Sequence, residues 1–331
     1  MKIGLIYNVK NDEAKQVLDM EAEFDSHDTV EAIAKAIRNL GYEVLYFEAN
    51  DTLFSKLSSY PIDLAFNIAE GMGGRGREAI VPAILEYLKI PYTGSDTTTL
   101  AIALDKTLTK RLISTYHLRV ARSIMAKSGK LSKTINLRYP VIVKPNAEGS
   151  SKGIDNHSVV ENEAELRTLV SKNYAIYQSD LICEEYIEGK EFTVGILGNG
   201  NNVEVLEPME IVFKTNIKLQ HNIYSYQVKQ DCNRYLEYVC PAVIDEHLKA
   251  GLQDNAKVVY RALGIKDFAR IDFIVSKSNR IYFLEVNPLP GLAPDYSDIV
   301  LIAQACGISH QELIQKIIDN AKERYGIKNR K

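Results

Sequence analysis

Residues 267–288 read DFARIDFIVSKSNRIYFLEVNP, two apolar runs joined by a short polar loop. Alternation along a strand places Arg270 and Asp272 on one face of the first run, and Glu285 and Asn287 on one face of the second. If the runs pair as antiparallel strands, two carboxylates and an amide oxygen meet at one point. Such oxygen ligands suit Mg²⁺, whose other ligands would be phosphate oxygens and water. We therefore expect a metal site at Asp272, Glu285 and Asn287, with Arg270 stabilising charge on a transferring phosphoryl group.

The alternative interpretation of these residues is a salt-bridged surface face. Asp272 and Glu285, however, lie within strongly apolar runs. An unpaired carboxylate in such surroundings costs free energy. A pair of acids kept there favours the metal interpretation.

The chain before this hairpin begins with alternating strands and helices. Strands are expected over 3–7, 43–47 and 63–68. One helix is expected between a cap at Ser26 or Asp28 and Gly41, and another over 79–89. This βαβ order implies a parallel sheet with ligand loops at the carboxyl ends of its strands.

The remaining pattern changes character twice. From about residue 96 we expect a helix over 105–116, a strand over 139–145, a helix over 162–170 and a strand over 181–184. Beyond residue 188 the pattern is rich in strands, at 191–197, 203–212, 223–229, 267–275 and 281–285, with helices over 244–263 and 310–325. The fold class is therefore α/β with mixed sheets, in three domains: 1–95 for substrate, 96–187 in the centre, and 188–331 with the metal site.

Composition excludes several classes of protein. The net charge of −3 gives no reason to expect nucleic acid or an anionic membrane as a partner. Four cysteines without C-x-x-C spacing suggest reduced thiols in a cytoplasmic protein. No apolar run is long enough to span a membrane.

Two glycine-containing loops invite nucleotide interpretations. The loop 148–153 follows a strand ending in Lys144, so its backbone N–H groups and that lysine could contact an anion; a flexible connector is the alternative. The loop 70–78 contains Gly71, Gly73 and Gly76 in the spacing G-x-G-x-x-G. No second strand ending in an acidic residue follows it, which argues against a dinucleotide site.

Seven motifs, taken together, are similar to those of D-alanine–D-alanine ligases, a family of ATP-grasp enzymes. They occur in the family's order and spacing over nearly the whole chain: YTGS 92–95, DK 105–106, VIVKP 141–145, EGSS 148–151, EFTV 191–194, RID 270–272 and EVNP 285–288. The resemblance implies a three-domain ATP-grasp fold with ATP between the central and C-terminal domains. It also implies an acyl-phosphate mechanism, in which an amine displaces phosphate from an activated carboxylate.

The resemblance implies a role for each matching residue. Phosphate contacts fall to Lys106, Lys144 and Lys229, and the loop with Glu148, Ser150 and Ser151 closes over the nucleotide. Glu184, with the backbone of Glu185 and Ile187, would bind adenine, and Glu191 the ribose. Asp272, Glu285 and Asn287 would hold two Mg²⁺ ions, for which Mn²⁺ is an alternative. Arg270 and the backbone N–H near Gly291 would stabilise the acyl-phosphate and its tetrahedral successor.

The substrate positions depart from this pattern. The family's Glu-Val-Ser is Phe24-Asp25-Ser26, so Glu23 or Asp25 is the candidate partner for an ammonium group. The family's His-Gly-x-x-Gly-Glu-Asp-Gly loop is replaced by residues 70–78, where Glu70, Arg75 and Arg77 suit the charged groups of an amino acid. The tyrosine after the loop lysine is Gln230, and the serine for the second carboxylate is Tyr296, beside Ser297. We expect at least one substrate larger or more acidic than alanine.

Three functions follow from these observations. The first is an ATP-dependent amino-acid or peptide ligase acting on small-molecule carboxylate and amine substrates other than two D-alanines. The second is an authentic D-alanine–D-alanine ligase, and the third a non-catalytic nucleotide-binding regulator. The complete metal set and Arg270 argue against the third. A homodimer is compatible with the sequence.

Overall fold

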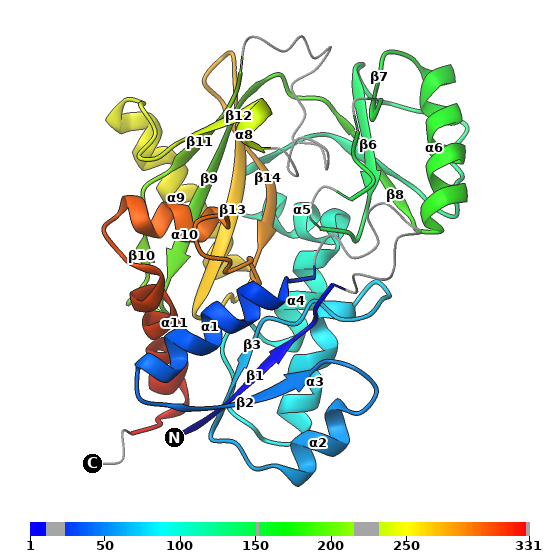
Figure 1. The fold of residues 1–331 in the computed structure, drawn as a ribbon. Coiled ribbons are helices and arrows are strands. Elements are labelled where there is room, and N and C mark those ends of the chain that lie inside the picture. The colour runs from blue at the N-terminus through cyan, green and yellow to red at the C-terminus, as the bar shows by residue number, and fades with distance from the viewer. Residues whose placement is uncertain (11–23, 150–151, 156, 215–231, 329–331) are drawn as a thin grey trace.

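The computed structural model describes residues 1–10, 24–149, 152–155, 157–214 and 232–328, arranged around three sheets. Figure 1 shows the N-terminal sheet at the bottom, the seven-stranded sheet at the upper left and the four-stranded sheet at the upper right. The mixed α/β class predicted from the sequence is confirmed. The candidate site lies where these units meet.

The N-terminal sheet is parallel, as predicted. β1 (Lys2–Tyr7) lies between β2 (Glu43–Glu48) and β3 (Leu64–Asn67). Successive residues of β1 point to opposite faces, and both faces are buried. Leu5 packs with α1 (His27–Asn39), whereas Ile6 packs with α2 (Leu53–Ser59) and α3 (Ile80–Tyr87). Because the described sheet is covered on both sides, a site is expected at the carboxyl ends of its strands.

The expected helix after Ser26 is α1, and its capping follows the sequence. The Ser26 hydroxyl accepts a hydrogen bond from the backbone N–H of Thr29 at 3.1 Å. The helix ends before Gly41, whose φ of +83° favours glycine. Ser26 is therefore engaged in holding the helix.

The four-stranded sheet is antiparallel throughout. Its order is β5 (Ser123–Ala126), β8 (Leu181–Glu185), β6 (Val141–Pro145) and β7 (Val159–Val160). Helix α6 (Glu163–Tyr177) covers one face (Figure 1). It runs seven residues past the predicted end at 170, because Tyr174 continues its apolar contact with the sheet.

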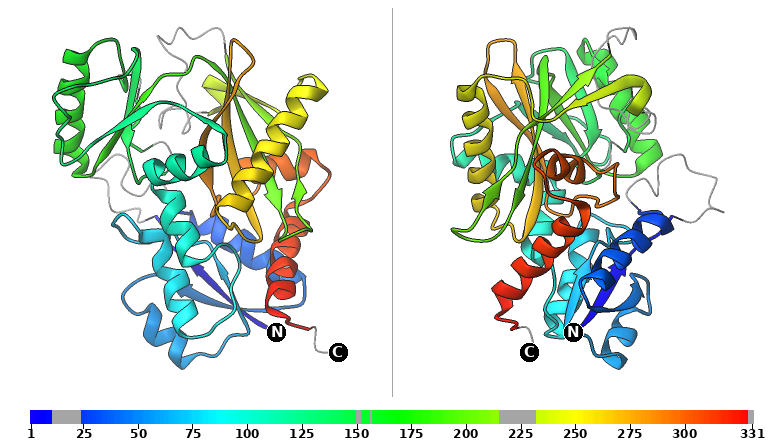
Figure 2. Two further views of the ribbon diagram at one scale, coloured as in Figure 1. Left: turned by 180° about the vertical axis from the view of Figure 1, so that it is seen from behind. Right: turned by 60° about the vertical axis from the view of Figure 1, so that its left-hand side comes forward.

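The seven-stranded sheet contains the hairpin formed by residues 267–288. Its order is β12 (Leu236–Val239), β11 (Met209–Phe213), β9 (Gly189–Leu197), β13 (Phe268–Ser276), β14 (Ile281–Asn287) and β4 (Arg119–Val120), and β10 (Glu204–Val205) pairs with β9. Helices α5 (Lys106–Thr115) and α9 (Glu246–Ala262) cover one face. Helices α10 (Asp298–Ala305) and α11 (His310–Tyr325) cover the other, and Figure 2 shows α11 continuing down beside the N-terminal unit.

Several elements differ from the sequence-based expectation. The strand expected over 203–212 is two strands, β10 and β11, and the one expected over 223–229 lies outside the described residues. Helices α2, α4 (Thr97–Leu104) and α10, the short helix α8 (Cys232–Tyr235) and the strands β4, β5, β7 and β12 were not predicted. The boundary near 95 falls just before α4, and that near 187 falls between β8 and β9. The three-domain division itself stays a prediction.

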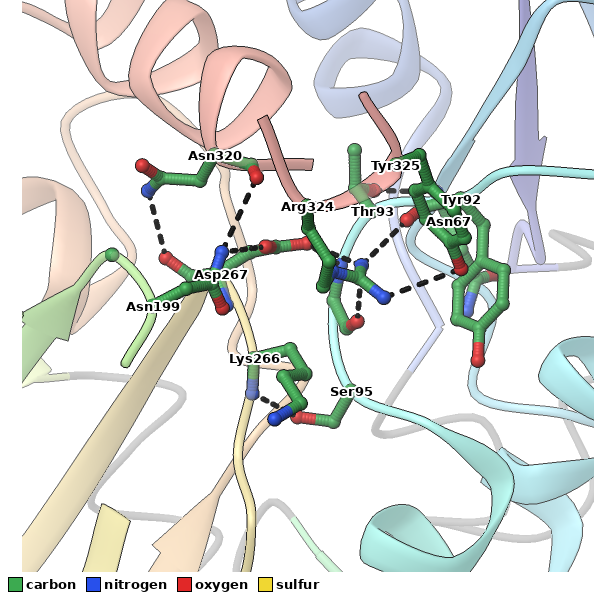
Figure 3. A network of polar contacts seen from close by, with 12 residues as sticks. Asn67, Tyr92, Thr93, Ser95, Asn199, Lys266, Asp267, Asn320, Arg324 and Tyr325 are labelled. Carbon is green, nitrogen blue, oxygen red and sulfur yellow. Dashed lines mark hydrogen bonds and ion pairs between the residues drawn. The ribbon is translucent and has the colours of Figure 1, made fainter. Parts of the chain in front are cut away.

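A buried aspartate joins the N-terminal unit to the C-terminal one (Figure 3). Asp267 is fully buried; its Oδ2 accepts hydrogen bonds from the Gly94 N–H at 2.8 Å and from Arg324 at 2.7 Å. Its Oδ1 accepts one from the Asn199 amide at 2.7 Å. Arg324 also donates to the carbonyl of Tyr92 at 2.7 Å. We call Asp267 with these partners the Asp267 hub.

Within the described part of the chain, no helix combines the length and the apolar character needed to cross a membrane.

Candidate active site

The β13–β14 hairpin brings together the four residues expected to share a face. In the antiparallel register Asp272 pairs with Glu285 and Arg270 pairs with Asn287. The register shifts between Asp272 and Phe273, a bulge of the kind that often re-aims side chains beside active sites. The site thus begins as two cross-strand pairs at the ends of neighbouring strands.

Arg270 is fixed by two carboxylates. Its guanidinium lies 3.0 Å from Oδ2 of Asp272 and also contacts Oδ2 of Asp298. Asp298 is the first residue of α10 and is buried. Sequence reasoning missed it, although Ser297 and Asp298 before an apolar run is a helix-start signal. Two acids on different elements set the direction of Arg270.

The acids of the hairpin form a site suited to a cation. Oδ1 of Asp272 is buried and has no hydrogen-bond partner among the described residues. Burial, with Glu285 nearby, raises the pKa of Asp272 to about 6 despite Arg270. Burial likewise raises the pKa of Glu191 to about 8, with Asp272 and Glu285 adding to the effect. Bringing carboxylates together at this cost fits a divalent cation that would relieve it.

The amide of the expected set is partly engaged, because Oδ1 of Asn287 accepts a hydrogen bond from the Leu289 N–H at 3.0 Å. Over the residues that the structure describes, no group of three or more His, Cys, Asp and Glu side chains is poised around a metal position. Two carboxylates and an amide at Asp272, Glu285 and Asn287 therefore stay a predicted ligand set.

Lysines from a helix and from a strand face these acids. Lys106 opens α5, which is capped by Asp105 through its bond to the Leu108 N–H at 2.9 Å. Its Nζ lies 3.6 Å from Oε2 of Glu285 and also contacts the carbonyl of Glu148. Burial works against ionisation of Glu285, but Lys106 and Lys144 outweigh it and hold its pKa at about 2. Glu285 is therefore ionised, and its negative charge faces these lysines.

Glu184 is held between two buried lysines. Its Oε1 lies 2.8 Å from Nζ of Lys110, and its Oε2 lies 2.8 Å from Nζ of Lys144. Burial alone would raise the pKa of Glu184, yet the two lysines lower it to about 2. Burial would likewise lower the pKa of Lys144, but Glu184 and Glu285 raise it. Sequence reasoning missed Lys110, whose signal is its i+4 spacing from Lys106 on one helix.

A narrow cavity of about 100 Å³ lies between β8 of the four-stranded sheet and β14 of the seven-stranded sheet. The residues expected to hold adenine and ribose line it: Glu184, Glu185, Ile187 and Glu191, together with Lys110, Lys144 and Tyr282. Both oxygens of Glu184 contact lysines here, so a bond from adenine would have to share one oxygen with a lysine. The adenine role of Glu184 stays a prediction.

A second cavity, of about 470 Å³, adjoins the hairpin and falls in the usual size range of ligand pockets. Its lining includes Lys106, Glu148, Arg270, Glu285 and Asn287, which were expected at the phosphates and the metal. The same lining includes Phe24, Asp25, Ser26, Glu70, Glu78, Gly291, Tyr296 and Ser297. Burial raises the pKa of Asp25 to about 7, with Lys10 opposing the shift. One cavity thus contains both the residues expected at the phosphates and residues where the sequence departs from the family.

Arg75 and Arg77, expected to recognise substrate, have carboxylate partners of their own. Both Nε and Nη2 of Arg75 lie 2.6 Å from Oδ2 of Asp105. Arg77 donates to the Ala147 carbonyl at 2.7 Å and lies 3.5 Å from Oε2 of Glu148. The two arginines are absent from the lining of the large cavity as far as the chain is described. The expectation of a more acidic substrate, which rested on these arginines, stays a prediction.

Ser297 has a structural contact as well. Its hydroxyl accepts a hydrogen bond from the Ala293 N–H at 3.0 Å, which closes the loop after Gly291. Tyr296 is half exposed at the cavity. The remaining predicted residues, Glu23, Ser150, Ser151, Lys229 and Gln230, lie outside the described part of the chain.

The lysines, the acidic hairpin and the cleft between two sheets define an ATP-grasp ligase. Residues 116–319 match the family model described as "D-ala D-ala ligase C-terminus". The chain is 35% identical over 295 residues to the D-alanine–D-alanine ligase of Aquifex aeolicus, covering 88% of this chain and 93% of that one. It is 32% identical over 303 residues to the uncharacterized protein y4sG of Sinorhizobium fredii, covering 89% and 88%.

The structure is similar to the crystal structure of Bacillus anthracis D-alanine–D-alanine ligase complexed with ATP. The TM-score is 0.74 at 22% identity, with 98% of this chain and 99% of that chain covered. The chain belongs to the D-alanine–D-alanine ligase family of ATP-grasp proteins. It is an ATP-dependent ligase that forms an amide bond, in a family that uses ATP and Mg²⁺.

Proposed function

We propose that this ligase joins the carboxylate of one amino acid to the amine of another through an acyl-phosphate, and that at least one of the two differs from D-alanine. The observation that carries the proposal is the large cavity. Lys106, Arg270 and Glu285, which stand in motifs similar to those of the family, line it. Phe24 and Tyr296, which stand where the family has a glutamate and a serine, line it as well.

The chemistry assigned to the residues expected at the phosphates is positioning and charge neutralisation. A carboxylate oxygen of the first substrate attacks the γ-phosphorus of ATP, and the bond to the bridging oxygen of ADP breaks. Lys106 and Lys144 would hold the phosphates in line. Asp272, Glu285 and Asn287 would hold Mg²⁺ or Mn²⁺, which when bound neutralises charge on the phosphate oxygens.

The second half of the reaction takes place at the acyl carbon. The neutral amine nitrogen of the second substrate attacks it, and phosphate leaves with the electron pair of the broken C–O bond. The proton that the nitrogen loses passes to the departing phosphate, which leaves the neutral amide. Arg270, fixed by Asp272 and Asp298, can stabilise the oxyanion and the departing phosphate. The backbone N–H near Gly291, on the cavity wall, is the second candidate donor.

Acidic residues of the cavity lining support an ammonium-bearing first substrate. Asp25, Glu70 and Glu78 line the cavity, with Lys10 near Asp25, while Arg75 and Arg77 lie against Asp105 and Glu148. An ammonium group next to Asp25 would favour the charged carboxylate and lower its pKa from about 7. Phe24 adds apolar surface, so a side chain longer than a methyl group fits this lining better than alanine.

Authentic D-alanine–D-alanine ligase activity is the second candidate, and the activity named for the Aquifex aeolicus relative favours it. Product analysis by mass spectrometry distinguishes the two. The protein is given ATP and Mg²⁺ with D-alanine alone, and then with mixtures of L- and D-amino acids. We expect dipeptides from the mixtures and little D-alanyl-D-alanine. Efficient formation of that dipeptide, at ordinary turnover of about 1–10³ s⁻¹, would contradict the proposal.

A further inference from the structure

Two consecutive residues, Arg77 and Glu78, face different parts of the site. They open the short helix η1 (Arg77–Ala79) at the end of the loop 70–78. Glu78 lines the large cavity. Arg77 is 5% exposed and extends toward residues 147 and 148, where it bonds the Ala147 carbonyl at 2.7 Å and approaches Glu148 at 3.5 Å. One peptide bond therefore separates a cavity-lining acid from a contact with the segment after Lys144.

The segment that Arg77 contacts is also bound to the start of α5. The Lys106 N–H donates to the Asn146 carbonyl at 3.0 Å, and the Thr107 hydroxyl donates to Oδ1 of Asn146 at 2.6 Å. Oε2 of Glu148 lies 3.1 Å from Nζ of Lys152, in its own segment, and 3.5 Å from the guanidinium of Arg77, in the N-terminal unit. Arg75 adds a second link, to Asp105 at the cap of α5. Residues 146–148 and Lys106 thus form one fixed group, which the loop 70–78 holds from outside.

The backbone of this loop is itself constrained at Arg77. Gly71 has a φ of +81°, and a Cβ there would lie 2.4 Å from the Arg77 carbonyl oxygen. The Gly71 N–H also donates to Oδ1 of Asn8 at 2.9 Å, which anchors the loop near the end of β1. The position of Arg77 is therefore set by the N-terminal sheet.

From this arrangement we infer that Arg77 is a positioning residue for the nucleotide phosphates. It fixes Ala147 and Glu148, and through them Lys106, relative to the cavity wall at Glu78. The inference rests on the proposed function, in which Lys106 and Glu148 contact ATP. It is an alternative to the prediction that Arg77 binds a substrate carboxylate, and it gives the loop 70–78 contacts both with the cavity, through Glu78, and with residues 147 and 148, through Arg77.

The test measures binding of the ATP analogue AMP-PNP with Mg²⁺ by calorimetry, without any amino acid. Arg77→Met should weaken binding by about tenfold, because losing the hydrogen bonds of a charged group costs roughly that much in affinity. Arg77→Lys keeps the charge but lacks the second donor direction, so its loss should be smaller. Arg167→Met removes an exposed arginine paired with Glu163 and should leave binding unchanged. Wild-type affinity in Arg77→Met would overturn the inference.

A double-mutant cycle separates positioning from general loss of structure. In a Glu148→Gln background, Arg77→Met should weaken AMP-PNP binding by less than it does in the wild type, because the ion pair is already absent and only the bond to the Ala147 carbonyl is lost. The same tenfold loss in both backgrounds would contradict a role through Glu148. If Arg77→Met does not fold, the Arg77→Lys and Glu148→Gln pair supplies the cycle. A wild-type protein that fails to bind AMP-PNP would instead refute the proposed function, so the two failures are distinguishable.

Discussion

Two buried aspartates lie five residues apart at β13 and have opposite surroundings. Asp267, just before the strand, is 0% exposed, and each of its polar atoms has a partner (Figure 3). Asp272, inside the strand, is 4% exposed, and its Oδ1 has none among the described residues. Their exposure is nearly the same, so burial alone does not tell a structural acid from a functional one.

The difference lies in what each carboxylate is bonded to. Asp267 receives donors from three separate segments, at Gly94, Asn199 and Arg324, and so holds the fold together. Asp272 faces Arg270 on one side and the acids Glu285 and Glu191 on the other, and its pKa is raised to about 6 by burial and Glu285. An incompletely neutralised carboxylate lowers stability and leaves a position for a cation.

The largest effect on stability is expected at the hub. In Asp267→Asn the amide NH₂ must face either Arg324 and the Gly94 N–H or the Asn199 amide, and all of these are donors. Breaking a buried ion pair in this way costs about 3–5 kcal/mol. Backbone strain does not contribute, because asparagine tolerates the positive φ of +64° at this position. Urea unfolding measures the loss.

The matched control for Asp267→Asn is Asp245→Asn. Asp245 caps α9 by accepting the Leu248 N–H at 2.8 Å, and asparagine caps about equally well. Its unfolding free energy should stay within about 0.5 kcal/mol of the wild type. Similar losses of unfolding free energy in the two variants would show that the Asp267 hub stabilises the fold no more than an exposed helix cap does.

A smaller effect, on ATP affinity, is expected at Lys144. This lysine lines the narrow cavity and forms an ion pair with Glu184. Lys144→Ala should weaken ATP binding by at least tenfold, on the order of 1.4 kcal/mol, because a phosphate loses its positive partner. Glu184 keeps Lys110 at 2.8 Å, so the fold should persist. Calorimetry gives the affinity, and Lys257→Ala, which removes an exposed lysine, is the control. Unchanged ATP affinity would show that Lys144 stabilises the fold and does not bind ATP.

The smallest effect is expected at Asp25, as a change in how the free energy of unfolding depends on pH. Burial raises its pKa to about 7 when folded, above its ordinary value, so its stabilising contribution is complete below about pH 4 and is lost as the pH rises through 7. Asp25→Asn should therefore gain stability relative to wild type between pH 5 and pH 8. The gain should be roughly 1 kcal/mol, because Asp25 is only partly buried. Urea unfolding at the two pH values, with the exposed Asp51→Asn as control, measures it; parallel changes in both variants would contradict the assignment.

The hairpin pairing was predictable from sequence because it depends on local rules. Alternation placed Arg270 and Asp272 on one face, and the register of β13 with β14 follows from two apolar runs and a short loop. The N-terminal parallel sheet was predictable for the same reason. Short strands such as β4 and β7 were not, because two residues carry no periodic pattern and their pairing is set by distant neighbours.

The partners of the site residues were harder to predict. Nothing local indicates that Arg75 meets Asp105 or that Arg77 meets Glu148, since these contacts join segments 30 and about 70 positions apart. A charged loop beside a substrate site was therefore interpreted as facing the substrate. Lys110 and Asp298 carried local signals, a spacing along a helix and a helix start, that point to position but not to partner.

We propose that Asp272 serves catalysis, as a ligand of Mg²⁺, at the expense of stability. The direct measurement is ATP-dependent phosphate release by Asp272→Asn, in the presence of Mg²⁺ and an amino-acid mixture that the wild type turns over. We predict a loss of at least about a thousandfold, in line with several kcal/mol of charge stabilisation at a metal site, in a protein that unfolds at the same or higher urea concentration. Turnover at the wild-type rate in that variant would contradict the claim.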